Sequence, residues 1–309
     1  MERLLFPLLL ALMALTAHPG KVSAYEPDGS ELQLASVHAV VVDAGTGEEL
    51  YAKHADRQVP IASVTKLMTA LVVLDSGEPL DEWLTIVERK KKPPVNAWSR
   101  IRIGSELKRS DLLRITLMAS ENLAAYVLAR HHPGGMDAFV ADMNRKAREL
   151  GMTRTHFADP AGLYSENLST ARDLVKLIAE AGKREEIQDY TTTGRFTARF
   201  RSPRYQLGYG NTNLLVHRRN WDVTLSKSGY LNDAGRCLVM QARMDERPVT
   251  MVLLDSFGRR TPIGDAGRIR RWIQTSQGGA VAGAALEYER RQAAQYEREQ
   301  TRTAEGGPN

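Results

Sequence analysis

Hydrophobic and polar positions along the chain predict strands near both ends and helices between them. Residues 37–43 are mostly β-branched and apolar, and residues 49–53 alternate polar with apolar side chains. The turn-forming run Ala44-Gly45-Thr46-Gly47 separates these two segments, so together they predict a β-hairpin. Three further strand-like runs with short turns between them lie at 223–230, 236–243 and 249–255.

The intervening sequence carries the spacing of amphipathic helices. This spacing recurs in segments 67–74, 111–118, 123–129 and 136–150, and again after the last strand at 265–273. Thr170 followed by Asp173 is typical of a helix N-cap. We therefore expect an α+β fold, in which both ends of the chain form one five-stranded antiparallel sheet and the middle supplies packed helices and an inserted helical subdomain.

The first 24 residues differ from the rest of the chain. Arg3 precedes an apolar run at 4–17, and the small residues Val22-Ser23-Ala24 follow it, which predicts a cleavable signal peptide and export. The apolar run is interrupted by Pro7 and is shorter than the roughly 20 residues that span a bilayer. At the other end, residues 284–298 are rich in Ala, Glu, Arg and Gln, which favours a surface helix with at most loose membrane association.

Composition and charge are those of an ordinary folded protein. The chain has 309 residues, of which 42% are hydrophobic, and its net charge is only +5. Cys237 is the single cysteine, so no internal disulfide forms, and its apolar surroundings predict a buried thiol.

Two basic stretches have alternative interpretations. The arginines at 195–204 alternate with aromatic residues, a pattern that in a cytosolic protein would suggest single-stranded nucleic acid. Because export argues against nucleic acid, we expect a surface β-ribbon there, with a grip on an anionic polymer as the alternative. The run 89–92 before Pro93-Pro94 predicts a solvated loop, again with polymer binding as the alternative.

The strongest chemical signal is a hydroxyl and an amine three residues apart. Ser63 and Lys66 open an apolar helix directly after the predicted hairpin, and this spacing puts both on one helix face. A neutral lysine amine can take the proton of a serine hydroxyl, so Ser63 is the candidate nucleophile and Lys66 its base. Ser105 and Lys108 repeat the spacing in a polar stretch, where a cap or turn role is expected.

Two further motifs accompany this pair. Ser-Glu-Asn occurs at 120–122, between two helical segments where its side chains can project into a cleft, and again at 165–167 in a turn region. Lys227-Ser228-Gly229 occurs once, on a predicted strand, where glycine permits close approach of a ligand to the backbone.

In this order, the three motifs resemble those of the serine penicillin-binding proteins and β-lactamases. The runs 43–47, 61–68, 159–163 and 211–213 are similar to those of the low-molecular-mass D-alanyl-D-alanine peptidases. Ser120-Glu121-Asn122 and the tail at 284–296 resemble the endopeptidase branch of that family. The resemblance implies a β-lactamase/transpeptidase-like fold and the division 1–24 signal peptide, 25–275 peptidase domain and 276–309 polar tail, helical in part.

The resemblance also implies a role for each site residue. Ser63 attacks a D-alanyl carbonyl, Lys66 takes its proton, and Ser120 relays a proton to the leaving amine. The substrate-binding residues are Asn122 for an amide, Lys227 for carboxylate charge, Ser228 in place of the family's threonine, Gly229, and Tyr230, whose N–H joins that of Ser63 in an oxyanion hole. The implied partners are peptidoglycan stem peptides and, as covalent inhibitors, β-lactams; the location is the periplasm, and no cofactor, metal or nucleic acid is implied.

Several alternatives remain open. The family also contains carboxypeptidases that trim terminal D-alanine, and Glu121 replaces a glycine common in them, which predicts altered substrate choice unless its side chain points to solvent. A non-catalytic wall-binding module is the alternative from another class. A β-lactamase would need a carboxylate for deacylation, and the surroundings of Glu166 lack that family's pattern. The scattered histidines give no zinc-peptidase spacing.

Overall fold

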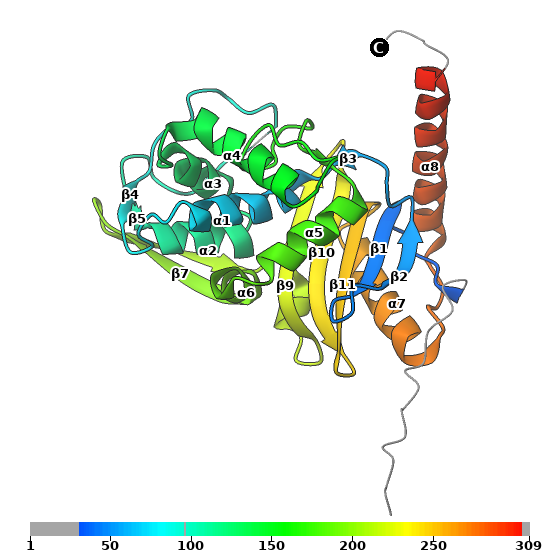
Figure 1. Cartoon of the computed structure of the whole chain (residues 1–309). Coiled ribbons are helices and arrows are strands. Elements are labelled where there is room, and N and C mark those ends of the chain that lie inside the picture. The colour runs from blue at the N-terminus through cyan, green and yellow to red at the C-terminus, as the bar shows by residue number, and fades with distance from the viewer. Residues whose placement is uncertain (1–30, 96, 305–309) are drawn as a thin grey trace, which may run out of the picture.

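The computed structural model describes residues 31–95 and 97–304 (Figure 1). The expected signal peptide at 1–24 lies outside the described residues. Within the described part of the chain, no helix combines the length and the apolar character that crossing a membrane requires.

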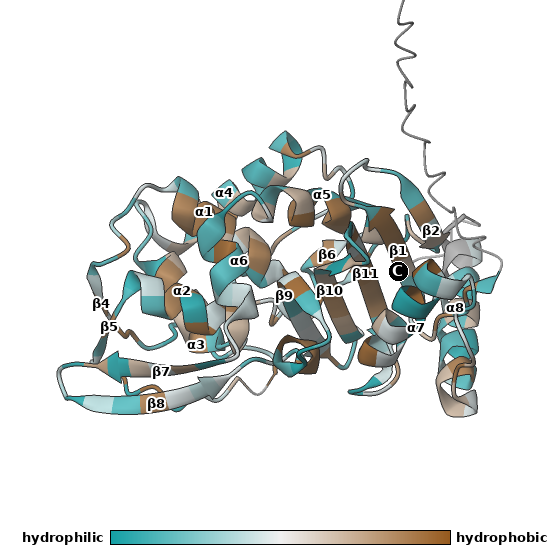
Figure 2. Ribbon diagram, turned by 90° about the horizontal axis from the view of Figure 1, so that it is seen from below, coloured by the Kyte–Doolittle hydropathy of each residue, from teal (hydrophilic) through white to brown (hydrophobic). Residues whose placement is uncertain are grey.

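A five-stranded antiparallel sheet forms the centre of the molecule, as the sequence predicts. Its order is β2-β1-β11-β10-β9, so the two N-terminal strands join the sheet beside the last strand. The strands are β1 (His38–Asp43), β2 (Glu49–Lys53), β9 (Asp222–Leu231), β10 (Gly235–Met244) and β11 (Arg247–Ser256). Hydrophobic residues line β1, β10 and β11 (Figure 2).

Both faces of this sheet are covered. Val40 and Val42 of β1 belong to the large core shared with the helices of the insert, whereas Ala39 and Val41 point to a second core. This alternation follows from the two-residue period of a strand, and it explains why all of β1 is buried. The second core is closed by α7 (Thr261–Thr275), whose Trp272 is fully buried.

The helical insert lies on the other face and to one side of the sheet (Figure 1). Its helices are α1 (Lys66–Asp75), α2 (Arg109–Met118), α3 (Asn122–Arg130), α4 (Gly135–Glu149), α5 (Ala171–Ala181) and α6 (Glu185–Thr192). Thr170 caps α5, because its side chain accepts a hydrogen bond from the N–H of Asp173. A ribbon of β7 (Arg195–Phe200) and β8 (Tyr205–Gly210) lies along the edge of the insert, which confirms the expected surface ribbon.

The structure adds elements that the sequence pattern does not predict. Ser63 lies in a 3-10 turn, η2 (Ala62–Thr65), and the α-helix begins only at Lys66. The strand pairs β3 (Val59–Pro60) with β6 (Leu168–Ser169), and β4 (Trp83–Thr85) with β5 (Glu106–Lys108), are two or three residues long. Strands this short carry no periodic signal in the sequence. Another 3-10 turn, η3, spans Leu214–His217.

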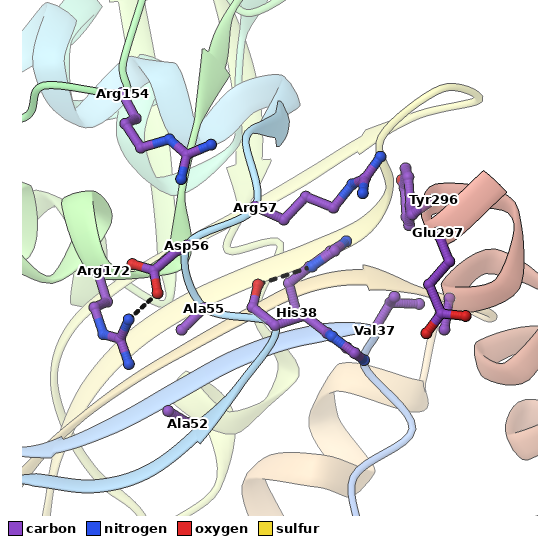
Figure 3. Close-up of a pocket in the computed structure, with 12 residues that line it drawn as sticks. Val37, His38, Ala52, Ala55, Asp56, Arg57, Arg154, Arg172, Tyr296 and Glu297 are labelled. Carbon is purple, nitrogen blue, oxygen red and sulfur yellow. Dashed lines mark hydrogen bonds and ion pairs between the residues drawn. The ribbon is translucent and has the colours of Figure 1, made fainter. Parts of the chain in front are cut away.

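The polar tail forms α8 (Gly283–Ala304), which packs beside β1 with part of its length extending past the sheet (Figure 1). The hydroxyls of Tyr288 and Tyr296 donate to the two carboxylate oxygens of Asp255, at 2.6 and 3.1 Å. Figure 3 shows Tyr296 on α8 beside Arg57, which lies 4.3 Å from the centre of its ring, and beside His38 of β1. Two polar contacts on one carboxylate therefore hold the tail helix against the end of β11.

Candidate active site

The predicted nucleophile and base are in direct contact. The Nζ atom of Lys66 lies 2.8 Å from the Oγ atom of Ser63, across the junction between η2 and α1. Lys66 also donates to the Oδ1 atom of Asn122 at 2.8 Å and to the carbonyl of Ala161 at 2.5 Å. Three segments of the insert therefore meet at one amine.

Burial makes this amine a base. Lys66 is fully buried, and this lowers its pKa from 10.5 to about 7, because the charged form loses its hydration. The carboxylates of Asp159 and Glu121 act in the opposite direction, and Arg89 lowers the pKa further. A large fraction of Lys66 is therefore neutral near neutral pH.

A second lysine and serine face this pair. Lys227 on β9 is buried, and its Nζ atom donates to the Oγ atom of Ser120 at 3.0 Å and to the carbonyl of Ser228 at 2.7 Å. Burial, and after it the charge of Lys66, holds the pKa of Lys227 well below its usual value. Ser120 itself has φ of +57°, in the left-handed region, a strained conformation that is common at functional sites.

Strand β9 lies closely against the turn that carries Ser63. A Cβ atom on Gly229 would be 3.0 Å from the backbone nitrogen of Ser63 and 3.1 Å from the Cβ atom of Ala62. A larger residue would crowd the turn that carries Ser63, so glycine lets β9 pack directly against it. Next to it, the hydroxyl of Ser228 donates to the hydroxyl of Thr212 at 2.7 Å.

A cavity of about 570 Å³ opens beside these groups, which we call the nucleophile cleft. Ser63, Ser120, Asn122, Ser228, Gly229 and Tyr230 line it, together with Thr212, Arg236 and Arg259. The structure thus brings together all the site residues predicted from sequence, since the two lysines lie behind Ser63 and Ser120. Tyr230 is half exposed, and the guanidinium of Arg236 lies 3.7 Å from the centre of its ring.

The loop that supplies the Ala161 carbonyl was part of the family resemblance at 159–163, but the sequence assigned it no chemical role. Both carboxylate oxygens of buried Asp159 accept backbone N–H bonds, from Ala161 and Leu163, and one also accepts from the side chain of Asn167. Gly162 has φ of +70°, and a Cβ atom there would lie 2.0 Å from the carbonyl oxygen of Ala62. The turn-forming run 159–163 was a visible signal, but only the structure shows that it contacts the base.

The second copies of the two repeated motifs, at 105–108 and 165–167, have structural roles. The hydroxyl of Ser105 is buried and donates to the carbonyl of Arg102 at 2.6 Å, as expected for a turn. The Asn of the second Ser-Glu-Asn is the Asn167 that braces the loop. The carboxylate of Glu121 caps α3 by accepting from the N–H of Ala124 at 2.5 Å, a contact that the sequence analysis did not predict.

Cys237 also matches its prediction. It is buried in β10, and burial raises the pKa of its thiol to about 12. The thiol is therefore structural.

Comparisons with known proteins agree with this geometry. A family model described as D-alanyl-D-alanine carboxypeptidase matches residues 22–258. The chain is 45% identical to the D-alanyl-D-alanine endopeptidases of Pseudomonas aeruginosa, over 92% of each chain, and Escherichia coli, over 86% of each.

Solved structures show the same fold. The Streptomyces DD-transpeptidase is 28% identical with a TM-score of 0.72, and the match covers 79% of this chain and 98% of that one. Penicillin-binding protein D2 of Listeria monocytogenes, in its cefotaxime-bound form, is 27% identical with a TM-score of 0.68, covering 79% of this chain and 99% of that one. With a buried lysine in contact with a serine, and with relatives along nearly its whole length, the chain belongs to the D-alanyl-D-alanine carboxypeptidase family of serine peptidases.

Proposed function

We propose that this protein is a D-alanyl-D-alanine endopeptidase that hydrolyses D-alanyl-diaminopimelyl cross-links in peptidoglycan through an acyl-serine intermediate. The observation that carries the proposal is the contact of the buried amine of Lys66 with the hydroxyl of Ser63, at 2.8 Å. The choice of an endopeptidase rests on the two relatives of that name that are 45% identical to the chain.

Acylation begins when neutral Lys66 takes the hydroxyl proton of Ser63, whose oxygen attacks the D-alanyl carbonyl. The N–H groups of Ser63 and Tyr230 stabilise the negative charge on the carbonyl oxygen. Ser120, held by Lys227 at 3.0 Å, gives its hydroxyl proton to the leaving amine and takes in return the proton that Lys66 removed from Ser63. The C–N bond then breaks, and the amine of the second stem peptide leaves neutral.

Deacylation reverses these steps with water. Lys66, neutral again after its proton has passed to the leaving amine, takes a proton from a water molecule that attacks the ester of Ser63. The ester bond breaks, and the serine oxygen takes that proton back from Lys66, which becomes neutral again. β-Lactams acylate the same serine, and the slow deacylation of the product makes them inhibitors.

The remaining residues bind substrate. Asn122 presents its amide to the peptide backbone of the substrate, while its Oδ1 atom holds Lys66. Lys227, together with the hydroxyl of Ser228, attracts a carboxylate on the leaving side, and Gly229 lets this strand lie close enough to do so.

Export completes the proposal. Residues 1–24 act as a cleavable signal peptide, residues 25–275 form the peptidase domain, and the polar tail at 276–309, which includes α8 (Gly283–Ala304), gives at most loose membrane association. The enzyme works in the periplasm on stem peptides, with no role for nucleic acid.

Carboxypeptidase activity is the second candidate, because it is the description of the family model. Glu121, which replaces the glycine common in carboxypeptidases, caps α3 by accepting from the N–H of Ala124, so this residue also has a structural role.

The test compares kcat/KM of the purified enzyme on cross-linked muropeptide dimers and on monomeric pentapeptides. The proposal predicts faster conversion of dimer to monomer. Faster release of free D-alanine from pentapeptide would instead establish the carboxypeptidase. The Ser63→Ala variant, which should do neither, is the control for contaminating hydrolases.

A further inference from the structure

A second cavity, of about 590 Å³, borders the active site on the other flank of Asn122. It shares Asn122 with the nucleophile cleft, and its wall includes Ala161, whose carbonyl accepts from Lys66. Tyr126 and Tyr164 give it partly apolar sides. We call it the flanking cavity; it is large enough for an extended side chain, and Asn122 separates it from the nucleophile cleft.

Four cationic side chains line the flanking cavity: Arg89, Lys90, Lys91 and Arg130. In the described part of the chain, the ammonium groups of Lys90 and Lys91 and the guanidinium of Arg130 have no hydrogen-bond or ion-pair partner. Lys90 and Lys91 are exposed. These charges are therefore available to a ligand.

Arg89 adds a buried donor. One of its terminal nitrogens donates to the carbonyl of Ala97 at 3.1 Å, while the other, Nη2, is buried without a hydrogen-bond partner among the described residues. An unpaired buried guanidinium nitrogen costs stability unless a ligand oxygen reaches it.

Only two carboxylates line the same cavity. That of Asp159 is already occupied by backbone N–H groups and Asn167, and that of Asp137 lies exposed at the mouth. The lining therefore has a surplus of positive charge, and its chemistry fits a carboxylate ligand.

The two cavities share Asn122, and Ser63 lines only the nucleophile cleft. Ser120, the proposed proton donor to the leaving amine, lines the nucleophile cleft and not the flanking cavity. The proposed role of Ser120 assigns the leaving stem to the nucleophile cleft, and it leaves the flanking cavity, on the other side of Asn122, for the acyl side of the substrate.

We propose that the flanking cavity is a subsite for the donor stem, in which Arg89, Lys90, Lys91 and Arg130 bind the free carboxylate at the end of the diaminopimelyl side chain that precedes D-alanine. This inference rests on the proposed function and names the part of the substrate that the basic run recognises. It gives residues 89–91 a role in selecting stems with a free carboxylate over stems in which that group is an amide.

The experiment uses two synthetic cross-linked dimers that differ only in this donor group, a free carboxylate or a primary amide. The wild-type enzyme should show kcat/KM about five- to tenfold higher for the acid, and added salt should narrow this ratio. Lys91→Gln and Arg130→Gln should each bring the acid-to-amide ratio toward one. Lys92→Gln is the matched control, because Lys92 belongs to the same exposed run but does not line the cavity, and it should keep the wild-type ratio.

Equal wild-type kcat/KM values for the acid and amide dimers would overturn the proposal. Equal changes in the acid-to-amide ratio in Lys91→Gln and Lys92→Gln would also overturn it. The donor stem is the same in monomeric pentapeptides, so the acid and amide forms of a pentapeptide provide a second arm. If the dimers are not cleaved but acid pentapeptide is preferred over amide, the endopeptidase assignment fails and the subsite stands. If dimers are cleaved at equal rates in the acid and amide forms, the endopeptidase assignment stands and the subsite fails.

Discussion

The Nζ atom of Lys66 lies within hydrogen-bonding distance of Ser63 Oγ, at 2.8 Å, while Asn122 and Ala161 offer it two acceptor oxygens. A neutral amine has two N–H groups and one lone pair. With its N–H groups directed at the two acceptors, the lone pair faces the hydroxyl, which then donates to it. The surroundings of Lys66 thus match the protonation state that a base needs, and burial favours that state.

Acylation should depend on pH through this amine. The pKa of Lys66 is lowered to about 7, so the reactive neutral form is scarce at pH 5 and predominates at pH 9. The second-order rate constant for acylation by a β-lactam should therefore rise between about pH 6 and 8 and then level. A rate that kept rising to pH 10, near the ordinary lysine pKa, would contradict this assignment. Because Lys66 and Lys227 are coupled, the measured value belongs to the pair.

Ser120→Ala should slow catalysis without displacing Ser63. The variant removes the hydroxyl that Lys227 holds, and with it the proposed route of the proton to the leaving amine. Loss of general acid catalysis typically costs 10²–10⁴-fold, so kcat on dimers should fall by about that factor. Ser105→Ala, at a turn hydroxyl far from this path, is the control and should retain activity. Near-normal turnover by Ser120→Ala would remove it from the mechanism.

Gly229→Ala should disrupt the site through a single methyl group. The new Cβ atom would lie 3.0 Å from the nitrogen of Ser63, so β9 and the nucleophile turn must move apart. Acylation should slow at least tenfold, since small misplacements of reacting groups have large effects on rate. Gly208→Ala on the β7–β8 ribbon, where a Cβ atom meets nothing within 4 Å, is the comparison. Equal acylation rates in the two variants would show that the close approach is unimportant.

Glu121 should matter for stability and not for substrate choice. Its carboxylate caps α3, and loss of such a cap typically costs about 1 kcal/mol, so Glu121→Ala should lower Tm by a few degrees. Glu121→Gln keeps an acceptor oxygen and should lie closer to the wild type. Neither variant should change the ratio of kcat/KM on dimers to that on pentapeptides. A change in this ratio with unchanged Tm would restore the specificity role considered from sequence.

The large elements were predictable because each has its own local signal. Alternation in residues 49–53 and the apolar run 37–43 predict the hairpin, and both faces of β1 are indeed buried. The order of Ser63, Ser120 and Lys227 predicted one site from motifs up to 164 positions apart. This grouping relied on the resemblance to a known family, since no local signal in the sequence links these residues.

The finer geometry depends on long-range packing that no short segment encodes. Ala62 has φ of +47°, which its own side chain disfavours, and surrounding contacts must impose it. Gly162 is needed because of Ala62, a hundred positions earlier. The cap formed by Glu121 was missed for a different reason: the helix was expected to start at 123, and capping depends on the true first residue, Asn122.

The most direct measurement of the central claim locates the covalent bond. The purified enzyme is treated with a penicillin, digested and analysed by mass spectrometry. The adduct should be found on the peptide that contains Ser63, it should disappear in Ser63→Ala, and it should persist in Ser105→Ala. An adduct on any other residue, or labelling of Ser63→Ala at the wild-type level, would contradict the assignment of Ser63 as the nucleophile.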